Sequence, residues 1–399
     1  MAAPVVIVGA GQGGLQAAES LRSEGFSGDI LLLGAEPHAP YHRPPLSKGL
    51  LLGETTAGQL AIRQPTVFER KGIALRPGTP VAAIDAAART VTLDGGERLD
   101  YAALVLATGA RPRRLPVPGG ERALCLRGLD DAQAIAARLP DARRVVVVGG
   151  GFIGLEMAAV ARTLGKEVTV VEAAGRLMAR VAAPPLSLHY HALHEERGCT
   201  ILLNAAVAAL EEGAVVCADG RRLPADLVVL GIGVEPETAL AEAAGLECDR
   251  GVVVDGCGRT SAADVYAIGD CAARRMADGS LLRLESVQNA VELGKACAAA
   301  IVGREQPFMA APWFWSDQYD AKLQMVGLSA GADTVVTRGH GAALSWFHFR
   351  AGRLVAIDSI NRPADHMAGR KLLAGPNSLT LAQAADEDYP LKEALPATA

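Results

Sequence analysis

The chain has 399 residues, of which 50% are apolar and 21% are charged, and its formal net charge is −5. This length exceeds that of one typical core and predicts two or three domains, in a composition typical of globular proteins. The negative charge argues against general nucleic-acid binding, and no apolar run is long enough to span a membrane, so we expect neither nucleic acid nor a membrane as partner.

The cysteines are odd in number and scattered, and no two form a Cys-x-x-Cys pair. We therefore expect no disulfide framework and no metal site. The N-terminus lacks a basic leader, which predicts no signal peptide, and a reducing cytoplasm fits this pattern best. The seven positions are Cys125, Cys199, Cys217, Cys248, Cys257, Cys271 and Cys297.

The first motif is a glycine-rich turn that follows an apolar strand. Residues 5–8 predict a buried strand, and they lead directly into Gly9-Ala10-Gly11-Gln12-Gly13-Gly14. A helix with an apolar stripe follows, and residues 29–33 predict a second strand that ends near Glu36. A strand, a glycine turn, a helix and an acid about twenty residues further on form the fingerprint of a dinucleotide-binding unit.

Short elements follow the first unit. Residues 40–48 are rich in proline and predict a loop. Alternating apolar and polar residues predict three antiparallel strands, at 81–85, 90–93 and 98–100. The apolar run 101–107 ends at Thr108-Gly109, which predicts a buried strand whose carboxyl end meets a ligand.

A second copy of the glycine motif begins after a predicted helix at 129–139. The strand 145–148 leads into Gly149-Gly150-Gly151-Phe152-Ile153-Gly154. A helix over 152–164 and a strand over 167–172 follow, and this strand ends in Glu172. Two such units in one chain predict two bound dinucleotides between which electrons could pass.

Two later apolar runs also end in residues that are suited to contact a bound cofactor. Residues 226–230 lead into Gly231-Ile232-Gly233, and residues 264–268 lead into Gly269-Asp270. Asp270 is suited to bind a ribityl hydroxyl of a flavin, although a strand-end aspartate is also a common helix cap. The helix predicted over 286–302 starts near Val287, and its positive end could face the flavin pyrimidine.

The pattern changes after Pro307. An aromatic segment at 312–317 precedes four predicted antiparallel strands, at 323–328, 334–338, 344–350 and 353–359, and a helix at 363–373. We expect a separate α+β domain here, with frayed residues over the last dozen positions.

The glycine turns have a specific chemical use. Backbone N–H groups at a helix N-terminus hold a pyrophosphate, and glycine lets the phosphate come close; the alternative use of such turns is tight packing of a strand on a helix. Glu36 and Glu172 are predicted to accept hydrogen bonds from ribose hydroxyls, and Glu172 would repel a 2′-phosphate, which favours NAD over NADP. Solvated strand-end acids are the alternative, and Arg176 could weaken the discrimination.

Two charged residues are candidates for the catalytic site. Lys48 follows two prolines, and Glu156 lies two residues after the second glycine motif, on a helix aimed at the predicted cleft. Our hypothesis is an ion pair near the flavin, although each residue could instead be a solvated charge. His189, His191 and His194 have a spacing that could suggest a metal site, but a helix face is the better interpretation because no acid or cysteine completes the set.

Longer motifs are more specific than the glycine turns. The chain resembles the NADH-dependent ferredoxin reductases that serve bacterial oxygenases, and the resemblance covers nearly its whole length. The segments that carry it are 37–48, 107–112, 149–156, 265–271, 285–290, 312–318 and 361–363.

The resemblance implies an α/β fold of glutathione-reductase-like flavoprotein architecture, with two Rossmann-like dinucleotide-binding domains and a C-terminal α+β domain. FAD would bind residues 1–110 and 234–308, NADH would bind residues 111–233, and residues 309–399 would form the third domain. The FAD contacts would be Gly9, Gly11, Gly13, Gly14, Glu36, Arg43, Lys48, Val81, Ala107, Arg127, Asp270, Val287 and Trp315. The NADH contacts would be Gly149, Gly151, Phe152, Ile153, Gly154, Glu156, Glu172 and Gly233. Trp315 would close over the flavin edge, unless it is a core tryptophan.

The resemblance also implies the electron acceptor, a two-iron two-sulfur ferredoxin that feeds an oxygenase or a cytochrome mono-oxygenase. An acidic ferredoxin would dock on a basic face, for which Arg63, Arg70, Arg304 and Arg338 are candidates, each also readable as a solvated arginine. We expect a monomer or a weak homodimer.

Two alternatives to this function remain. One is an NADH oxidase or flavin reductase that uses oxygen or a small acceptor. The other is a redox-sensing flavoprotein similar to apoptosis-inducing factor. Disulfide reduction is not expected, because the first cysteine is Cys125 and the first domain therefore has no redox cysteine pair.

Overall fold

The structure is a computed structural model that describes residues 3–375 and 377–395. The chain divides into two compact units. Unit 1 contains Met1–His42, Gly58–Arg111 and Val234–Ala310, and unit 2 contains Arg43–Ala57, Pro112–Gly233 and Ala311–Ala399. Each unit therefore combines segments that are far apart in the sequence.

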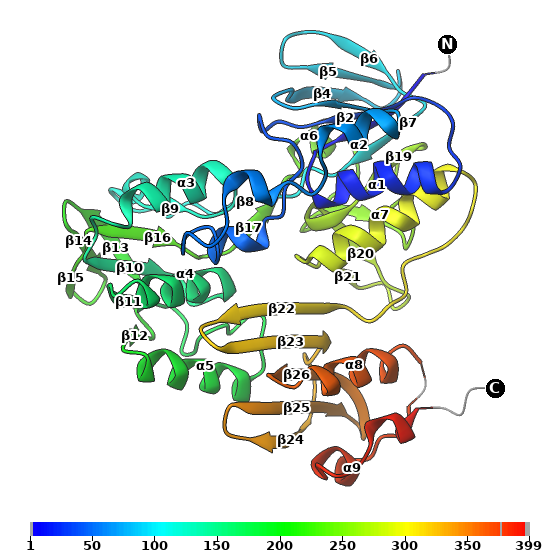
Figure 1. The fold of residues 1–399 in the computed structure, drawn as a ribbon. Helices are drawn as coiled ribbons and strands as arrows, with labels where there is room; N and C mark the ends of the chain where they lie inside the picture. The colour runs from blue at the N-terminus through cyan, green and yellow to red at the C-terminus, as the bar shows by residue number, and fades with distance from the viewer. Residues whose placement is uncertain (1–2, 376, 396–399) are drawn as a thin grey trace. The chain divides into compact units, whose positions relative to one another are not determined.

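Unit 1 is built on a five-stranded parallel sheet in the order β19-β7-β1-β2-β3 (Figure 1). Its strands β1, β2 and β7 are apolar throughout and wholly buried, as expected of parallel strands covered on both faces. The strand order places β1 beside both β2 and β7, which makes a switch point at their carboxyl ends. The strands are β1 (Val5–Val8), β2 (Ile30–Leu33), β3 (Ile73–Arg76), β7 (Ala103–Leu106) and β19 (Val265–Ala267).

The helices α1 (Gln12–Ser23) and α7 (Val287–Ile301) lie side by side in unit 1 (Figure 1). Small residues permit this close approach: a Cβ added to Gly294 would lie 3.3 Å from the carbonyl oxygen of Gly13. Because only residues 9–11 separate β1 from α1, the N-terminus of α1 lies at the carboxyl end of β1.

Unit 1 contains two further three-stranded sheets. The first has the order β4-β5-β6 and is antiparallel, and the second has the order β18-β20-β21. Their strands are β4 (Val81–Asp85), β5 (Thr90–Leu93), β6 (Arg98–Asp100), β18 (Val252–Val254), β20 (Ala272–Arg275) and β21 (Leu281–Leu282). The helices α2 (Pro65–Arg70) and α6 (Ala239–Ala243) complete the unit, and strands β8 (Ala110–Pro112) and β17 (Val234–Pro236) pair where the chain leaves it and returns.

Unit 2 repeats the parallel architecture. Its five-stranded sheet has the order β12-β11-β10-β16-β9, with β10 between β11 and β16 in the same way that β1 lies between β2 and β7. The strands are β9 (Leu124–Cys125), β10 (Arg144–Val148), β11 (Glu167–Val171), β12 (Thr200–Leu202) and β16 (Leu227–Leu230). The helices are α3 (Leu129–Arg138), α4 (Phe152–Thr163) and α5 (Pro184–Glu196), and β13 (Val207–Glu211), β14 (Ala214–Cys217) and β15 (Arg222–Pro224) form an antiparallel sheet.

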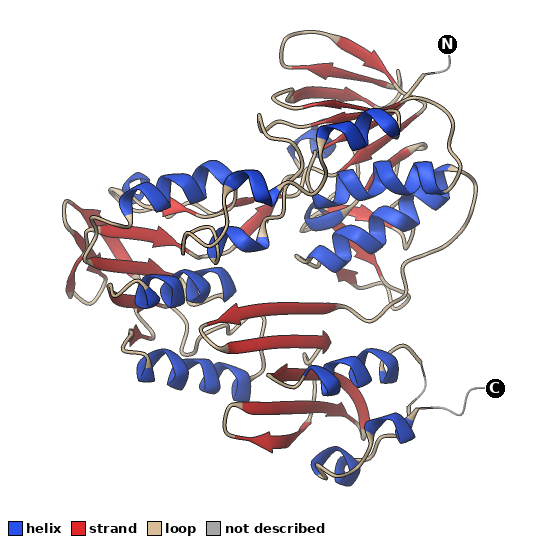
Figure 2. Cartoon of the chain, in the orientation of Figure 1, coloured by secondary structure: helices blue, strands red, loops and turns tan. Residues whose placement is uncertain are grey.

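The C-terminal part of unit 2 is a five-stranded antiparallel sheet with α8 packed on β23 and β26 (Figure 2). The strand order is β22-β23-β26-β25-β24, and α4 contacts the edge strand β22. The elements are β22 (Trp313–Gln318), β23 (Ala321–Gly327), β24 (Thr334–His340), β25 (Ala343–Arg350), β26 (Arg353–Ile360), α8 (Pro363–Leu372) and α9 (Leu381–Ala385).

The predicted fold class is confirmed: two Rossmann-like parallel sheets precede a C-terminal α+β domain. The expected fraying of the last dozen residues is wrong for the 3-10 helix η5 (Leu391–Ala394), since Leu391 and Ala394 are buried in the C-terminal core. Residues 396–399 lie outside the described residues. No helix in the described ranges is long and apolar enough to cross a membrane.

Candidate functional site

The glycine turn between β1 and α1 has three glycines with distinct roles. A Cβ on Gly9, whose φ is +114°, would lie 2.1 Å from the carbonyl oxygen of Ala107, so the turn fits against the end of β7 only without a side chain. A Cβ on Gly14 would lie 1.9 Å from the carbonyl oxygen of Gly9. A Cβ on Gly11 would meet nothing within 4 Å, so this glycine leaves open space at the helix N-terminus. The arrangement matches the division of labour in dinucleotide-binding turns.

Other predicted flavin contacts of unit 1 lie at the ends of its elements. Tyr41 donates a hydrogen bond to Glu36 at 2.5 Å, which orients the acid that follows β2. Asp270 lies in the 3-10 helix η4 (Gly269–Cys271), directly after β19, and Val287 is the first residue of α7. Val81 begins β4. The flavin contacts that the resemblance implies for these residues remain predictions.

The glycine turn between β10 and α4 repeats the geometry in unit 2. Gly149 has a φ of +105°, and a Cβ there would lie 2.5 Å from the carbonyl oxygen of Gly231 at the end of β16. A Cβ on Gly154 would lie 2.1 Å from the carbonyl oxygen of Gly149. At Gly151 the nearest atom to an added Cβ is the Gly231 oxygen at 3.6 Å, so a side chain fits here but would fill the space in front of the helix.

Glu172 is fixed at the end of β11 by backbone groups. Its two carboxylate oxygens accept hydrogen bonds from the N–H groups of Gly150 and Ala174, each at 2.7 Å. Arg176, which could have weakened discrimination against a 2′-phosphate, instead donates to the carbonyl oxygens of Ala179 and Ala182, and also to a serine hydroxyl. We therefore expect the charge of Glu172 to act without compensation from Arg176.

Sequence reasoning missed an arginine at this site. Arg180 is exposed, and a Cβ on Gly233 would lie 2.7 Å from its guanidinium, so the two residues are neighbours. Gly233 follows β16 and was implied as an NADH contact, whereas a lone arginine in a loop carries no pattern that points to a site.

Lys48 and Glu156 form an ion pair inside unit 2. The ammonium of Lys48 lies 2.7 Å from Oε2 of Glu156, and the exposed fractions of the two side chains are 21% and 3%. Ser47, the last residue of the 3-10 helix η1 (Pro44–Ser47), donates to the same oxygen at 2.5 Å. Ser316 of β22 donates to Oε1 at 2.6 Å. The carboxylate is thus buried with a cation and two hydroxyl donors, which offset its loss of hydration.

Arg43, Trp315 and Phe152 are predicted cofactor residues of unit 2, and each contacts a neighbouring residue. Arg43 donates to the backbone carbonyl of Arg127 at 2.9 Å. Trp315 is half-buried in β22, with its ring centroid 5.5 Å from that of Trp313. Phe152, the first residue of α4, contacts Phe314 in a tilted arrangement with 4.7 Å between ring centroids, and Ile153 beside it is exposed.

The three histidines of α5 have separate partners. His189 contacts the ring of Trp346, His191 pairs with Glu195 at 3.3 Å, and His194 is bonded to Gln318 at 2.8 Å. Within the described residues no group of His, Cys, Asp or Glu is arranged to hold a metal ion. The sequence interpretation did miss the contact between Cys199 and His194, in which the cysteine sulfur lies 3.7 Å from Nδ1.

One candidate docking residue was wrongly chosen. Arg338 is 5% exposed, and its guanidinium donates to the backbone carbonyls of Asp386, Glu387 and Tyr389, so it is not available on a basic face. Arg63 and Arg304 are exposed but are paired with Glu19 and Glu24. Arg70 is exposed at the end of α2.

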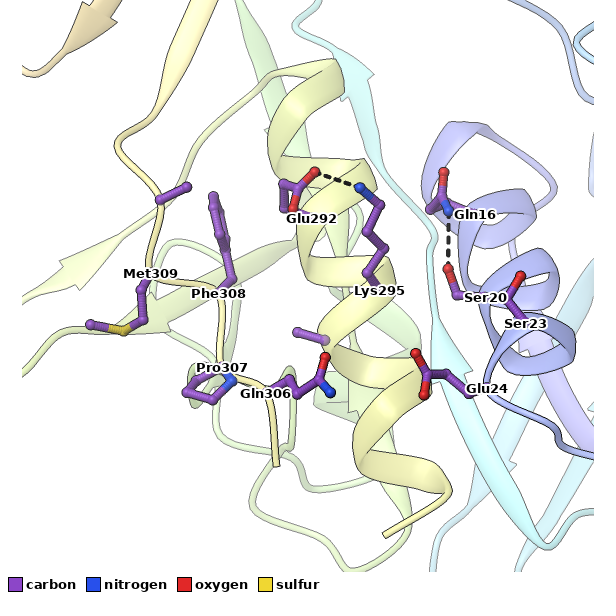
Figure 3. A pocket seen from close by; sticks show the side chains of 12 residues that line it. Gln16, Ser20, Ser23, Glu24, Glu292, Lys295, Gln306, Pro307, Phe308 and Met309 are labelled. Atoms are coloured by element: carbon purple, nitrogen blue, oxygen red, sulfur yellow. Dashed lines mark hydrogen bonds and ion pairs between the residues drawn. The ribbon is translucent and has the colours of Figure 1, made fainter. Parts of the chain in front are cut away.

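A shallow hollow of unit 1 lies between α1, α7 and the segment that follows α7 (Figure 3). Gln16 and Ser20 line one side and are joined by a hydrogen bond of 3.0 Å, while Lys295 and Glu292 pair on the other at 2.8 Å. The lining includes none of the predicted cofactor residues, so we do not assign it to the flavin site.

The residues at both turns fit a dinucleotide. The N-cap residues of α1 and α4 are Gly11 and Gly151, which have no side chain to accept the first N–H groups of the helix. These N–H groups therefore point to an open, positively polarised position, which suits a pyrophosphate. Gly9, Gly11 and Gly14 would hold the flavin dinucleotide, and the corresponding glycines of unit 2 would hold the nicotinamide dinucleotide.

Comparison with protein families accounts for nearly the whole chain. Residues 3–294 match a family described as pyridine nucleotide-disulphide oxidoreductase, and residues 313–395 match a family described as reductase C-terminal. The two five-stranded parallel sheets lie in the first match, and the five-stranded antiparallel sheet lies in the second.

Individual relatives are similar over nearly their full length. The chain is 45% identical to rhodocoxin reductase of Rhodococcus erythropolis, over 98% of this chain and 94% of the relative. It is 42% identical to putidaredoxin reductase of Pseudomonas putida, over 98% and 97%. Among solved structures, a ferredoxin reductase for the CYP199A2 system from Rhodopseudomonas palustris matches with a TM-score of 0.96 and 44% identity, over 98% and 100%. A covalent putidaredoxin reductase–putidaredoxin complex matches with a TM-score of 0.94 and 42% identity, over 98% and 97%.

Proposed function

Since the chain belongs to the pyridine nucleotide-disulphide oxidoreductase family, we propose that it takes a hydride from NADH and passes single electrons to a ferredoxin. It is an oxidoreductase that uses FAD and a pyridine nucleotide. The acceptor is a two-iron two-sulfur ferredoxin that feeds an oxygenase or a cytochrome mono-oxygenase. The observation that supports this acceptor is full-length similarity to reductases named for rhodocoxin and putidaredoxin, one of them crystallised in covalent complex with putidaredoxin.

The two glycine turns divide the cofactors. FAD binds residues 1–110 and 234–308, where Gly9, Gly11 and Gly14 cradle the pyrophosphate and Glu36 accepts a ribose hydroxyl. NADH binds residues 111–233, where the N-terminus of α4 meets the pyrophosphate and Glu172 accepts the ribose hydroxyls. The fixed charge of Glu172 repels a 2′-phosphate, so NADH is preferred to NADPH.

Bound FAD supplies a two-electron acceptor that can release its electrons one at a time. The protein residues then have to orient the nicotinamide and the flavin and to set the charge around the flavin, and they do not themselves react. Lys48 places a positive charge at the flavin, and Glu156 holds Lys48 in position. Phe152, whose ring contacts that of Phe314, bounds the nicotinamide position at the start of α4. One hydride delivered and two single electrons removed leave one proton to be released in each turnover.

The location and assembly follow from the same proposal. Seven free cysteines, Cys271 and Cys297 among the buried ones, fit a reducing cytoplasm. The enzyme acts as a monomer or a weak homodimer, which sedimentation over a range of concentrations would establish.

The proposal is tested with the purified flavin-loaded protein. NADH is added without oxygen, and fading of the yellow flavin colour is followed before a two-iron two-sulfur ferredoxin is supplied. We expect rapid fading, then reduction of two ferredoxins for each NADH at a rate well above that of oxygen consumption. Electron delivery to oxygen faster than to several such ferredoxins would favour an NADH oxidase, and stable reduced flavin without transfer to either acceptor would favour a redox sensor. Protein that binds no flavin would overturn the proposal.

A further inference from the structure

Strand β22 presents three alternate side chains to the helices of the second dinucleotide-binding fold. Successive side chains of a strand point to opposite faces, so Phe314, Ser316 and Gln318 share one face. The ring of Phe314 contacts the ring of Phe152, the first residue of α4, and Ser316 bonds to Glu156, one turn further along that helix. Gln318 reaches α5. The C-terminal sheet thus contributes a row of contacts to the helix that carries Glu156.

The hydrogen bonds along this row run in one direction. A carboxylate can only accept, so Ser316 donates its hydroxyl proton to Glu156, at 2.6 Å. The serine oxygen then accepts from Nε2 of Gln318 at 3.2 Å, which turns the amide oxygen toward Nε2 of His194 at 2.8 Å. His194 must therefore carry its proton on Nε2. The charge of Glu156 sets the orientation of three side chains in sequence.

The row of hydrogen-bonded side chains is almost completely shielded from water. The exposed fractions are 3% for Glu156, 1% for Gln318 and zero for Ser316 and His194. Burial lowers the pKa of His194, although the bond to Gln318 opposes this shift, so the ring is neutral near pH 7. In a neutral ring with a proton on Nε2, Nδ1 is an acceptor, and it faces the hydroxyl of Tyr319 at 3.4 Å. The sulfur of Cys199 lies 3.7 Å from the same nitrogen, so each hydrogen-bonding side chain of the row has partners on both sides.

The row is suited to hold Glu156 rather than to carry protons. An amide such as that of Gln318 donates and accepts hydrogen bonds but does not release a proton near neutral pH, so it interrupts any relay. It can, however, fix a neighbouring hydroxyl in place. On the opposite side of Glu156, Oε2 is occupied by Ser47 and Lys48, whereas Ser316 of the row donates to Oε1.

We propose that Ser316, Gln318 and His194 are positioning residues for hydride transfer, which hold the Glu156 carboxylate in the one orientation that keeps Lys48 at the flavin. The inference rests on the proposed function, because it takes the Lys48–Glu156 pair as part of the hydride-transfer site. It assigns a positioning role to the C-terminal domain: the edge strand of its sheet holds the carboxylate that serves the nicotinamide half of the reaction.

The first test removes the hydroxyl next to Glu156. Ser316→Ala in the flavin-loaded enzyme is expected to lower the anaerobic hydride-transfer rate at saturating NADH about tenfold, because a misplaced group loses orientation. The NADH concentration for half the maximal rate should change less than about twofold, since no residue that contacts the dinucleotide is altered. Ser359→Ala is the matched control, because Ser359 is a serine of the same sheet, 1% exposed, that bonds to Ser345 and not to Glu156.

The second test acts from the far end of the row. His194→Leu removes the donor to Gln318 and is expected to lower the same rate about threefold, whereas His194→Gln, which keeps an N–H donor near the Nε2 position, should stay within about twofold of the natural enzyme. A purely structural role of His194 would lower thermal stability in both variants without separating their rates. This pair also serves if Ser316→Ala fails to retain flavin.

The outcomes separate the two proposals. A natural enzyme that takes no hydride from NADH overturns the proposed function and this inference with it. Normal hydride transfer together with equal rates in Ser316→Ala and Ser359→Ala, or in His194→Leu and His194→Gln, overturns the positioning role alone.

Discussion

Glu172 accepts the backbone N–H of Gly150 at 2.7 Å, so the acid at the end of one strand and the glycine turn after its neighbour are directly joined. The carboxylate therefore contributes its charge at a fixed position beside the turn, and this position is the one that a ribose 2′ substituent is expected to approach.

Removing this charge should relax the choice of coenzyme. Glu172→Gln keeps an oxygen that can accept one backbone N–H but loses the repulsion of a 2′-phosphate. We expect the ratio of kcat/KM for NADPH to that for NADH to rise roughly tenfold, which corresponds to about 1.4 kcal/mol of relieved repulsion. Steady-state rates with both coenzymes measure the ratio. An unchanged ratio would show that the discrimination comes from elsewhere, and Arg180→Ala would then be the variant to compare.

The glycine turns predict a separation of folding from cofactor binding. Gly11 has a φ of −87° and open space around an added Cβ, so Gly11→Ala should fold but should lose flavin, because a methyl group occupies the phosphate position. Gly14→Ala should instead fail to fold normally, since its Cβ would lie 1.9 Å from a backbone oxygen. The flavin content and the far-ultraviolet circular dichroism of the two variants distinguish these results.

The same reasoning at the second turn affects only the nicotinamide coenzyme. Gly151 has a φ of −81°, and an added Cβ meets one oxygen at 3.6 Å, so Gly151→Ala should fold and keep its flavin. We expect the KM for NADH to rise at least tenfold, because the methyl group fills the space in front of α4. A variant with normal NADH kinetics would place the pyrophosphate away from this helix.

The buried ion pair should matter more for rate than for flavin binding. Glu156→Gln keeps the acceptor for Ser316 but removes the charge that holds Lys48. We expect hydride transfer to fall roughly ten- to a hundredfold, with flavin content unchanged. Glu167→Gln is the control, because Glu167 is an exposed acid of the same dinucleotide-binding fold that pairs with Arg143. Unchanged hydride-transfer kinetics in Glu156→Gln would remove this residue from the site.

Arg338 should stabilise the C-terminal segment rather than dock a ferredoxin. Arg338→Ala removes charged hydrogen bonds to Glu387 and Tyr389 at 2.8 and 2.9 Å, and should lower the free energy of unfolding by about 3 kcal/mol. We expect faster proteolysis near residues 386–389. Arg353→Ala, at an exposed position of the same sheet, should change neither property. A variant with normal stability but weaker ferredoxin reduction would restore the docking role.

Burial of His366 is expected to lower the stability of the folded protein at acid pH. The residue is 2% exposed, and burial, together with the charge of Arg370, lowers the pKa of His366 from its ordinary 6.5 to about 4. Between these values the unfolded chain binds a proton that the folded chain does not, so stability falls as the pH drops from about 6.5 to about 4, by roughly 3 kcal/mol at most. His366→Gln should flatten this part of the pH profile in chemical denaturation, while His340→Gln, at an exposed position, should not.

Local patterns predicted most of the secondary structure. The strands β4, β5 and β6 begin and end where the alternation placed them, and both glycine turns lie between an apolar strand and a helix as expected. These features depend on residues that are neighbours in the sequence, so the periodicity of a single segment is sufficient to predict them.

Tertiary partners were harder to predict. Ser316 and Gln318 looked like ordinary residues of an aromatic segment, and His194 like one member of a helix face. Their hydrogen bonds with Glu156 and with each other depend on how β22 docks on α4 and α5, which no local pattern encodes. The alternation of Phe314, Ser316 and Gln318 was the available signal, because it places all three on one face. The prediction that Arg338 lies on a docking face was wrong for the same reason, since the burial of this residue depends on the path of residues 386–389.

The chain passes from one unit to the other after His42, Ala57, Arg111, Gly233 and Ala310, five crossings in all. Neither unit can therefore be cut from the gene as one continuous fragment. The parallel sheet of unit 1 gains its last strand, β19, only after Val265–Ala267 has left the ribosome, so β7 has an unpaired apolar edge during much of translation. Expression at low temperature or with added chaperone should consequently raise the yield of folded protein. The stability of the finished enzyme should stay the same.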